Sequence, residues 1–245
     1  DKNMKNFSII LSSVAVVLAA TSSVYTAKHG SEGAASPAAI EEALKANPKM
    51  IIDALQAYQD QQREEQQKAA EEALAKYTPQ INSSENAPFV GPEDAKVTVV
   101  EFFDFSCHYC KKLAPALEKV MAENKDVKFI FKPLAFVDPE NSHYQEQAGL
   151  AVFKQGKFTE FYKAVMAAEG RMSKDAIDGI ARGLNIDFDK YKADVESDDV
   201  NNDLSEIADL SRNIQVNGVP TVLINGKHIQ TMSADDLQEA INAAK

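Results

Sequence analysis

The feature that most constrains this chain is its pair of cysteines, Cys107 and Cys110, which are the only two in 245 residues. Two cysteines three positions apart cannot form the set of disulfides that stabilises a small secreted fold. Any role of these cysteines must therefore come from the two residues as a local pair. A zinc site would need a second pair of ligands at a suitable spacing, whereas the histidines are scattered and only His108 is adjacent. We therefore predict a redox-active pair that needs no metal and no bound cofactor.

Regular patterns flank the two cysteines. Residues 96–103 are rich in Val and Phe and predict a strand, the residues after Cys107 have helical periodicity, and residues 127–132 predict a second strand. Strand, helix, strand is a βαβ unit, which implies a sheet that is at least partly parallel. Cys107 then begins the helix, where unpaired backbone N–H groups and the helix dipole favour a thiolate. Cys110 follows one turn later, close enough to form a disulfide.

The rest of this region predicts an α/β domain with a helical insertion at about residues 139–215, where only helical periodicity recurs. Two short strands follow at 221–224 and 227–229, joined by a turn, and a closing helix spans 233–244. Aromatic residues of the insertion, such as Tyr162, fit a helical core better than a cofactor site. The helical pieces of the insertion are expected at 145–155, 158–168, 173–184, 187–196 and 201–213.

The N-terminal part predicts two appendages to this domain. Residues 1–27 carry lysines, an apolar run and then small residues, which is the layout of a secretory signal peptide, or of a short membrane anchor if it is not cleaved. Residues 36–78 predict a helical stalk with Ser36 as its N-cap. Residues 79–92 are rich in Pro, Gly, Asn and Ser and predict a linker into a domain at 93–245.

The predicted stalk is partly apolar in its first half and mainly polar in its second half. Its first half carries an apolar stripe, which Asn47–Pro48 is expected to break into two helices. Residues 59–72 are Gln, Glu, Lys and Arg for the most part, so they are expected to be solvated on nearly every side. Such a helix could pack on its own domain. We favour a homo-oligomer formed through residues 37–76, because the polar stem would hold the stripe away from the domain. The stripe consists of Ile40, Leu44, Ile51, Ile52, Leu55 and Tyr58.

Composition excludes some classes of partner. The formal net charge of −11 and the pI near 4.9 argue against nucleic acid, because phosphate binding needs clustered Lys and Arg. The sequence also contains no Gly-rich phosphate loop and no nucleotide-binding fingerprint. We therefore expect protein partners and no nucleic acid.

The stretch from Val100 to Cys110, VEFFDFSCHYC, resembles the active-site strand and loop of the DsbA family of bacterial periplasmic oxidoreductases. Lys111 and Pro115 are similar to residues of the thioredoxin active-site helix. The segment Gly218-Val219-Pro220-Thr221, before a strand, resembles the loop whose cis-proline faces the cysteines in this superfamily. The resemblance implies a thioredoxin fold with an inserted helical subdomain, here preceded by the helical stalk.

The resemblance also implies roles for the residues at the motif. Cys107 would be the attacking thiolate and Cys110 the buried resolving thiol, and His108, if protonated, would favour the thiolate. Glu101 would be the family's buried acid, whose pKa is raised by desolvation and which relays the proton of Cys110. The alternative for Glu101 is a solvated carboxylate at a strand end. A pairing of Glu101 with Lys132 is also possible.

The proline loop would bind substrate. If Val219–Pro220 is cis, it places a backbone edge beside the disulfide with which a substrate strand can pair. A trans turn proline is the alternative. Tyr109 and Val219 are expected to contact the substrate.

The resemblance implies an exported, periplasmic thiol-disulfide oxidoreductase that forms or rearranges disulfides in unfolded or misfolded exported proteins. An oxidase would need a DsbB-like membrane partner, and an isomerase a DsbD-like one. The order His108-Tyr109 and the N-terminal extension resemble ScsC-type proteins, in which the extension holds an oligomer together, whereas Val219 before the proline resembles the oxidase branch. We expect isomerase character supplied by an oligomer.

Three alternatives to this function stay open. A monomeric DsbA-like dithiol oxidase would use the same residues without the stalk. A client-binding chaperone module would give the cysteines a minor role. A kappa-type glutathione transferase would share the fold, but those proteins lack a paired Cys-x-x-Cys.

Overall fold

The computed structural model of the chain describes residues 36–245, so the expected signal peptide at 1–27 lies outside the described residues. The chain divides into two compact units between Glu64 and Glu65. We describe each unit by itself. No helix within residues 36–245 is long and apolar enough to cross a membrane.

The first unit is helical, as predicted. Helix α2 (Pro37–Ala46) begins with Ser36 as N-cap, whose Oγ accepts a hydrogen bond from the backbone N–H of Ala39 at 3.2 Å. Helix α3 starts at Lys49 and continues to Ile81 in the second unit. The predicted break at Asn47–Pro48 is confirmed. Six apolar side chains of this unit are at least 46% exposed: Ile40, Met50, Ile51, Ile52, Leu55 and Tyr58.

The second unit is built on a five-stranded sheet with the order β1-β3-β2-β4-β5. The parallel pair β2–β3 flanks α4 (His108–Glu123), which confirms the predicted βαβ unit, and the other strand pairs are antiparallel. The strands are β1 (Phe89–Val90), β2 (Thr98–Phe103), β3 (Lys128–Pro133), β4 (Thr221–Ile224) and β5 (Lys227–Ile229).

The segment 79–92 differs from the expected linker. It contains β1, which pairs with β3, and the side chains of Ile81 and Ala87 are fully buried. Pro88, which flanks β1, accepts a hydrogen bond through its carbonyl from the Phe131 N–H at 2.8 Å. A two-residue strand among turn-forming residues gives no alternating pattern, so sequence periodicity could not reveal it. The segment is packed against the sheet.

Each face of the sheet has its own apolar core. One face presents Val99 and Phe103 of β2 to the helices α4, α6 (Phe158–Ala167) and α10 (Ala234–Ala244). The other face presents Val100 and Phe102 to the end of α3 and to α9 (Asp198–Asn213). The result is the predicted α/β thioredoxin fold, with helices on both sides of a mixed sheet.

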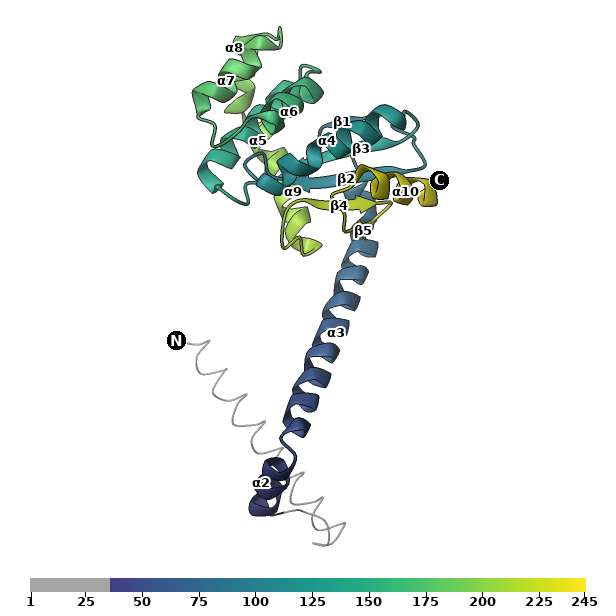
Figure 1. The fold of residues 1–245 in the computed structure, drawn as a ribbon. Helices are drawn as coiled ribbons and strands as arrows, with labels where there is room; N and C mark the ends of the chain where they lie inside the picture. Colours follow the sequence, from purple (N-terminus) through teal and green to yellow (C-terminus); the bar gives the residue numbers. More distant parts are fainter. Residues whose placement is uncertain (1–35) are drawn as a thin grey trace, which may run out of the picture. The chain divides into compact units, whose positions relative to one another are not determined.

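Five helices separate β3 from β4, which confirms a helical insertion in the sheet order. Figure 1 shows four of them grouped beside the sheet: α5 (Pro139–Phe153), α6, α7 (Lys174–Gly183) and α8 (Phe188–Val195). Helix α5 begins six residues before the expected piece at 145–155. Its first turns bury polar residues such as Asn141 and Gln145, and these hide the apolar periodicity.

Candidate active site

The two cysteines lie at the N-terminus of α4, directly after β2. Cys107 is the N-cap residue, and its backbone N–H donates to the carbonyl of Asp104 at 3.0 Å. Its thiol donates to the carbonyl of Val219 at 3.4 Å. Cys107 is 5% exposed and Cys110 is fully buried. An incoming sulfur can therefore reach only the first cysteine.

The surroundings give the two thiols different acidities. The pKa of Cys107 is lowered to about 6, first by the hydrogen bond from the Cys110 thiol and also by the backbone N–H groups of Cys110 and Tyr109, against the opposing effect of burial. Burial raises the pKa of Cys110 far above its ordinary value. At neutral pH, Cys107 is thus mainly a thiolate and Cys110 keeps its proton.

Glu101 lies in β2 beneath the cysteines and is 1% exposed, so the alternative of a solvated carboxylate is wrong. Its Oε2 accepts a hydrogen bond from the hydroxyl of Tyr162 in α6 at 3.0 Å. Its Oε1 has no hydrogen-bond partner among the residues described. Burial raises the pKa of Glu101 to about 8, although the Tyr162 hydrogen bond lowers it. Glu101 can therefore gain or lose a proton near neutral pH.

Lys132 does not pair with Glu101. In the β2–β3 register, Glu101 lies opposite Phe131 and Lys132 lies opposite Phe102. Because successive side chains in a strand point to opposite faces, Glu101 and Lys132 lie on opposite sides of the sheet. The buried ammonium of Lys132 instead donates to the carbonyl of Ser83 at 3.1 Å, and burial lowers its pKa to about 8. Glu101 is therefore left with Tyr162 as its polar partner.

The proline loop lies beside Cys107. The Val219–Pro220 peptide bond is cis, so the alternative of a trans proline is wrong. The Thr221 hydroxyl donates to the carbonyl of Gly218 at 2.8 Å and closes the loop. The Val219 carbonyl contacts the Cys107 thiol. The structure thus brings together Cys107, Cys110 and the proline loop, as the sequence predicted.

The two residues between the cysteines point outward. His108 and Tyr109 are exposed, Tyr109 by 61% of its surface, and their ring centroids are 5.8 Å apart. The Lys112 ammonium lies 5.8 Å from the Tyr109 ring centroid. Both side chains are placed where they can meet a partner molecule.

Sequence reasoning missed two residues of this site. Tyr162 was interpreted as core, because the helical periodicity of α6 gives no sign of a contact with Glu101, 61 residues away. Asp104 is fully buried although it follows a strand directly, which is a position where a polar residue marks a loop. Its carboxylate accepts backbone N–H bonds from Ser106, Phe136 and Val137 at 2.7, 2.8 and 2.7 Å, and a hydroxyl bond from Ser142 at 2.8 Å. Asp104 therefore joins the active-site loop to a neighbouring loop.

Within residues 36–245 no group of three or more His, Cys, Asp or Glu side chains could hold a metal ion. The polar groups at the cysteines include the Glu101 carboxyl, the Tyr162 phenol and backbone amides. These groups can stabilise a thiolate and move a proton.

Comparisons with known proteins agree with this geometry. A protein-family model described as Thioredoxin matches residues 82–243. The Na(+)/H(+) antiporter NhaA 1 of Salinispora arenicola is 28% identical over 157 residues, which are 63% of this chain and 24% of the antiporter. The chain thus spans about a quarter of that relative. A probable disulfide bond formation protein D of Bacillus cereus is 28% identical over 169 residues, 62% of this chain and 76% of that protein.

Among solved structures, ScsC of Proteus mirabilis in a transitional conformation has a TM-score of 0.64 at 28% identity. The likeness covers 84% of this chain and 94% of ScsC. The family match contains β2, both cysteines and the proline loop, and it extends over more than half of the sequence. The chain therefore belongs to the thioredoxin superfamily, as a DsbA-like member.

Proposed function

We propose that this chain catalyses thiol-disulfide exchange with unfolded or misfolded exported proteins in the periplasm. The observation that carries the proposal is the contrast between the two thiols: Cys107 is acidic and lies against the Val219 carbonyl, whereas Cys110 is buried and protonated. The name of the Bacillus cereus relative, a disulfide bond formation protein, supports the same chemistry.

In the oxidising direction the pair starts as a Cys107–Cys110 disulfide. A client thiolate attacks the Cys107 sulfur, the bond to Cys110 breaks, and Cys110 leaves and takes a proton, which Glu101 can supply. A second client thiolate then attacks the client sulfur of the mixed disulfide and releases Cys107 as a thiolate. The client loses two electrons to the cysteine pair. Its thiols lose their protons to solvent when they ionise, and the proton on Cys110 comes from Glu101. A membrane redox partner of DsbB type would return the pair to the disulfide.

In the rearranging direction the reduced pair starts the reaction. The Cys107 thiolate attacks a client disulfide, and a client thiolate leaves. That thiolate attacks another client disulfide and frees a second client thiolate, which attacks the client sulfur of the mixed disulfide and releases Cys107 as a thiolate. If rearrangement stalls, Cys110 attacks Cys107 and releases the client, and Glu101 accepts the Cys110 proton. A partner of DsbD type would keep the pair reduced. Glu101 serves both directions because its pKa of about 8 lets it exist in both forms near neutral pH.

We also propose that the first unit assembles the chain into a homo-oligomer with isomerase character. The support is the apolar stripe of α2 and the start of α3, in which all but the half-buried Leu44 are at least 46% exposed. Contiguous exposed apolar surface of this kind marks an interaction site. The monomeric oxidase and the client-binding chaperone are the alternatives that the experiment must separate.

The experiment compares reactivation of a test protein with scrambled disulfides and oxidation of the same protein after reduction. Leu55→Glu places a charge in the stripe, and Ala57→Glu is its matched control, since Ala57 lies on the same helix away from the stripe. Sedimentation should show an oligomer for the wild type and Ala57→Glu, and a smaller species for Leu55→Glu that oxidises but no longer reactivates. Equal reactivation by Leu55→Glu as a monomer would overturn the role of the first unit. Retained activity in Cys107→Ala would favour the chaperone.

A further inference from the structure

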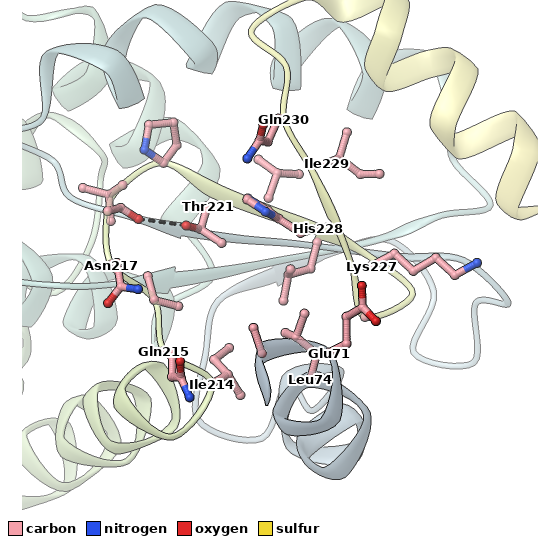
Figure 2. A pocket seen from close by; sticks show the side chains of 18 of the residues that line it. Glu71, Leu74, Ile214, Gln215, Asn217, Thr221, Lys227, His228, Ile229 and Gln230 are labelled. Atoms are coloured by element: carbon pink, nitrogen blue, oxygen red, sulfur yellow. Dashed lines mark hydrogen bonds between the residues drawn. The ribbon is translucent and has the colours of Figure 1, made fainter. Parts of the chain in front are cut away.

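A large groove opens beside the active site within the second unit, with a volume of about 1560 Å³. One wall is the part of α3 from residue 67 to 78, and the other is the β4–β5 hairpin with the loop at 214–220. Figure 2 shows Glu71 and Leu74 of α3 on one side of this groove, and Gln215, Asn217 and His228 on the other. The sequence analysis expected residues 59–72 to be solvated on nearly every side, so the groove was not expected.

Helix α3 contributes one continuous face to the groove. The lining positions recur every three or four residues, which is the spacing of one side of an α-helix. The helix is held in this place by Leu74 and Tyr77, which pack against the core that contains Ile81. The α3 residues that line the groove are Gln67, Ala70, Glu71, Leu74, Ala75 and Thr78.

The groove leads to the reactive cysteine. Tyr109, Val219 and Pro220 belong to its lining, and the Val219 carbonyl is the group that contacts the Cys107 thiol at 3.4 Å. A molecule bound covalently to Cys107 would therefore have its remaining atoms at the mouth of this groove.

The lining suits a polypeptide better than a small charged ligand. Four side-chain amides, which both donate and accept hydrogen bonds, stand among apolar residues: Gln67, Gln215, Asn217 and Gln230. Glu71 and Lys227 carry opposite charges, so neither sign of ligand is favoured. Small-molecule sites usually measure about 300–1,000 Å³, which is less than this groove. The groove-lining strand β5 is also an edge strand, paired with β4 alone, and edge strands accept extended peptides.

We infer that residues 67–78 of α3 form one wall of a binding site for the extended client segment that flanks the client's cysteine. This inference rests on the proposed exchange activity and adds the recognition of the client to it. The lining part of α3 rises by roughly 17 Å at 1.5 Å per residue. An extended chain covers that length with about five residues at 3.3 Å each. The site would therefore contact about five residues on one side of the client cysteine.

The test uses the full chain and two thiol substrates of different length. Ala75→Arg fills the groove from the α3 wall with a long side chain. Ala69→Arg is the control, since Ala69 is exposed on the opposite side of the same helix and does not line the groove. Each protein, in its oxidised form, reacts with N-acetylcysteine and with a peptide carrying one cysteine and about six residues on either side of it. The ultraviolet absorbance of the Cys107 thiolate is titrated in each variant to show that the active site is unchanged.

We expect Ala75→Arg to lower the second-order rate constant for the peptide about tenfold, equivalent to about 1.4 kcal/mol, and to leave N-acetylcysteine unaffected. Ala69→Arg should match the wild type with both substrates. The inference is overturned if Ala75→Arg reacts with the peptide as the wild type does, or if it slows both substrates equally. If the wild type reacts with neither thiol, the proposed exchange activity itself fails, and the inference fails with it.

Discussion

Replacement of Tyr162 by Phe should slow the release of a bound client. The Tyr162 hydroxyl donates the hydrogen bond that Glu101 Oε2 accepts at 3.0 Å, and Oε1 has no partner among the described residues. A hydrogen bond to an ionised group is worth about 1.4 kcal/mol more than one to a neutral group, which corresponds to about 1 pKa unit. The variant should thus shift the pKa of Glu101 upward from about 8 by that amount. At pH 7 the ionised fraction would fall about tenfold, and so would any step that needs Glu101 as a base.

The assay follows the attack of Cys110 on a coloured aromatic thiol held by Cys107 as a mixed disulfide. The rate should be about tenfold lower in Tyr162→Phe than in the wild type at pH 7. The difference between the two rates should shrink as the pH rises, because the variant reaches its half-maximal rate at a higher pH. Tyr191→Phe is the matched control: Tyr191 is also buried in the insertion, but its hydroxyl donates to Asp178 at 2.9 Å. A Tyr162→Phe profile with the wild-type rate and midpoint would refute the reasoning.

Three further predictions test the site. Cys110→Ala should raise the pKa of Cys107 above about 6, because the Cys110 hydrogen bond is the largest cause of its lowering; an unchanged ultraviolet titration would contradict this. Asp104→Ala should lower the free energy of unfolding in urea by about 3 kcal/mol, because four donors lose their acceptor, and a loss below about 1 kcal/mol would count against the role assigned to Asp104. The pKa of Glu101 is raised from 4.5 to about 8, so the stability this group contributes is complete below pH 4.5 and is lost as the pH rises to about 8. Between pH 4.5 and about 8, the free energy of unfolding of Glu101→Gln should therefore rise relative to that of the wild type. Both proteins should still lose stability with pH because of Glu146, whose pKa is also raised to about 8.

Much of the fold could be predicted because its signals are local. The Val- and Phe-rich run of β2, the helical pattern after Cys107 and the strand β3 each show in fewer than twenty residues. Their order fixes the βαβ unit and places Cys107 at the start of a helix. The proline loop was predicted from its resemblance to a family motif. It lies against Cys107 although 112 residues separate the contacting groups.

The features that were missed depend on contacts that no local pattern encodes. The partner of Glu101 could not be found from periodicity, because the strand register that puts Lys132 on the opposite face is set by tertiary pairing. Tyr162 has the same pattern as its core neighbours in α6. The part of α3 that lines the groove contains polar residues such as Gln67 and Glu71, which in sequence predict exposure to solvent. Only the tertiary structure shows that the β4–β5 hairpin lies opposite them.

The most direct test of the central claim is to trap the mixed disulfide. Oxidised test protein is mixed with reduced Cys110→Ala or reduced Cys107→Ala, the reaction is quenched with acid, and the cross-linked species are mapped by mass spectrometry. If Cys107 is the attacking thiolate and Cys110 the resolving thiol, Cys110→Ala accumulates a client adduct on Cys107, and Cys107→Ala forms none at a comparable rate. An adduct that forms as quickly on Cys110 in the Cys107→Ala variant would contradict the account.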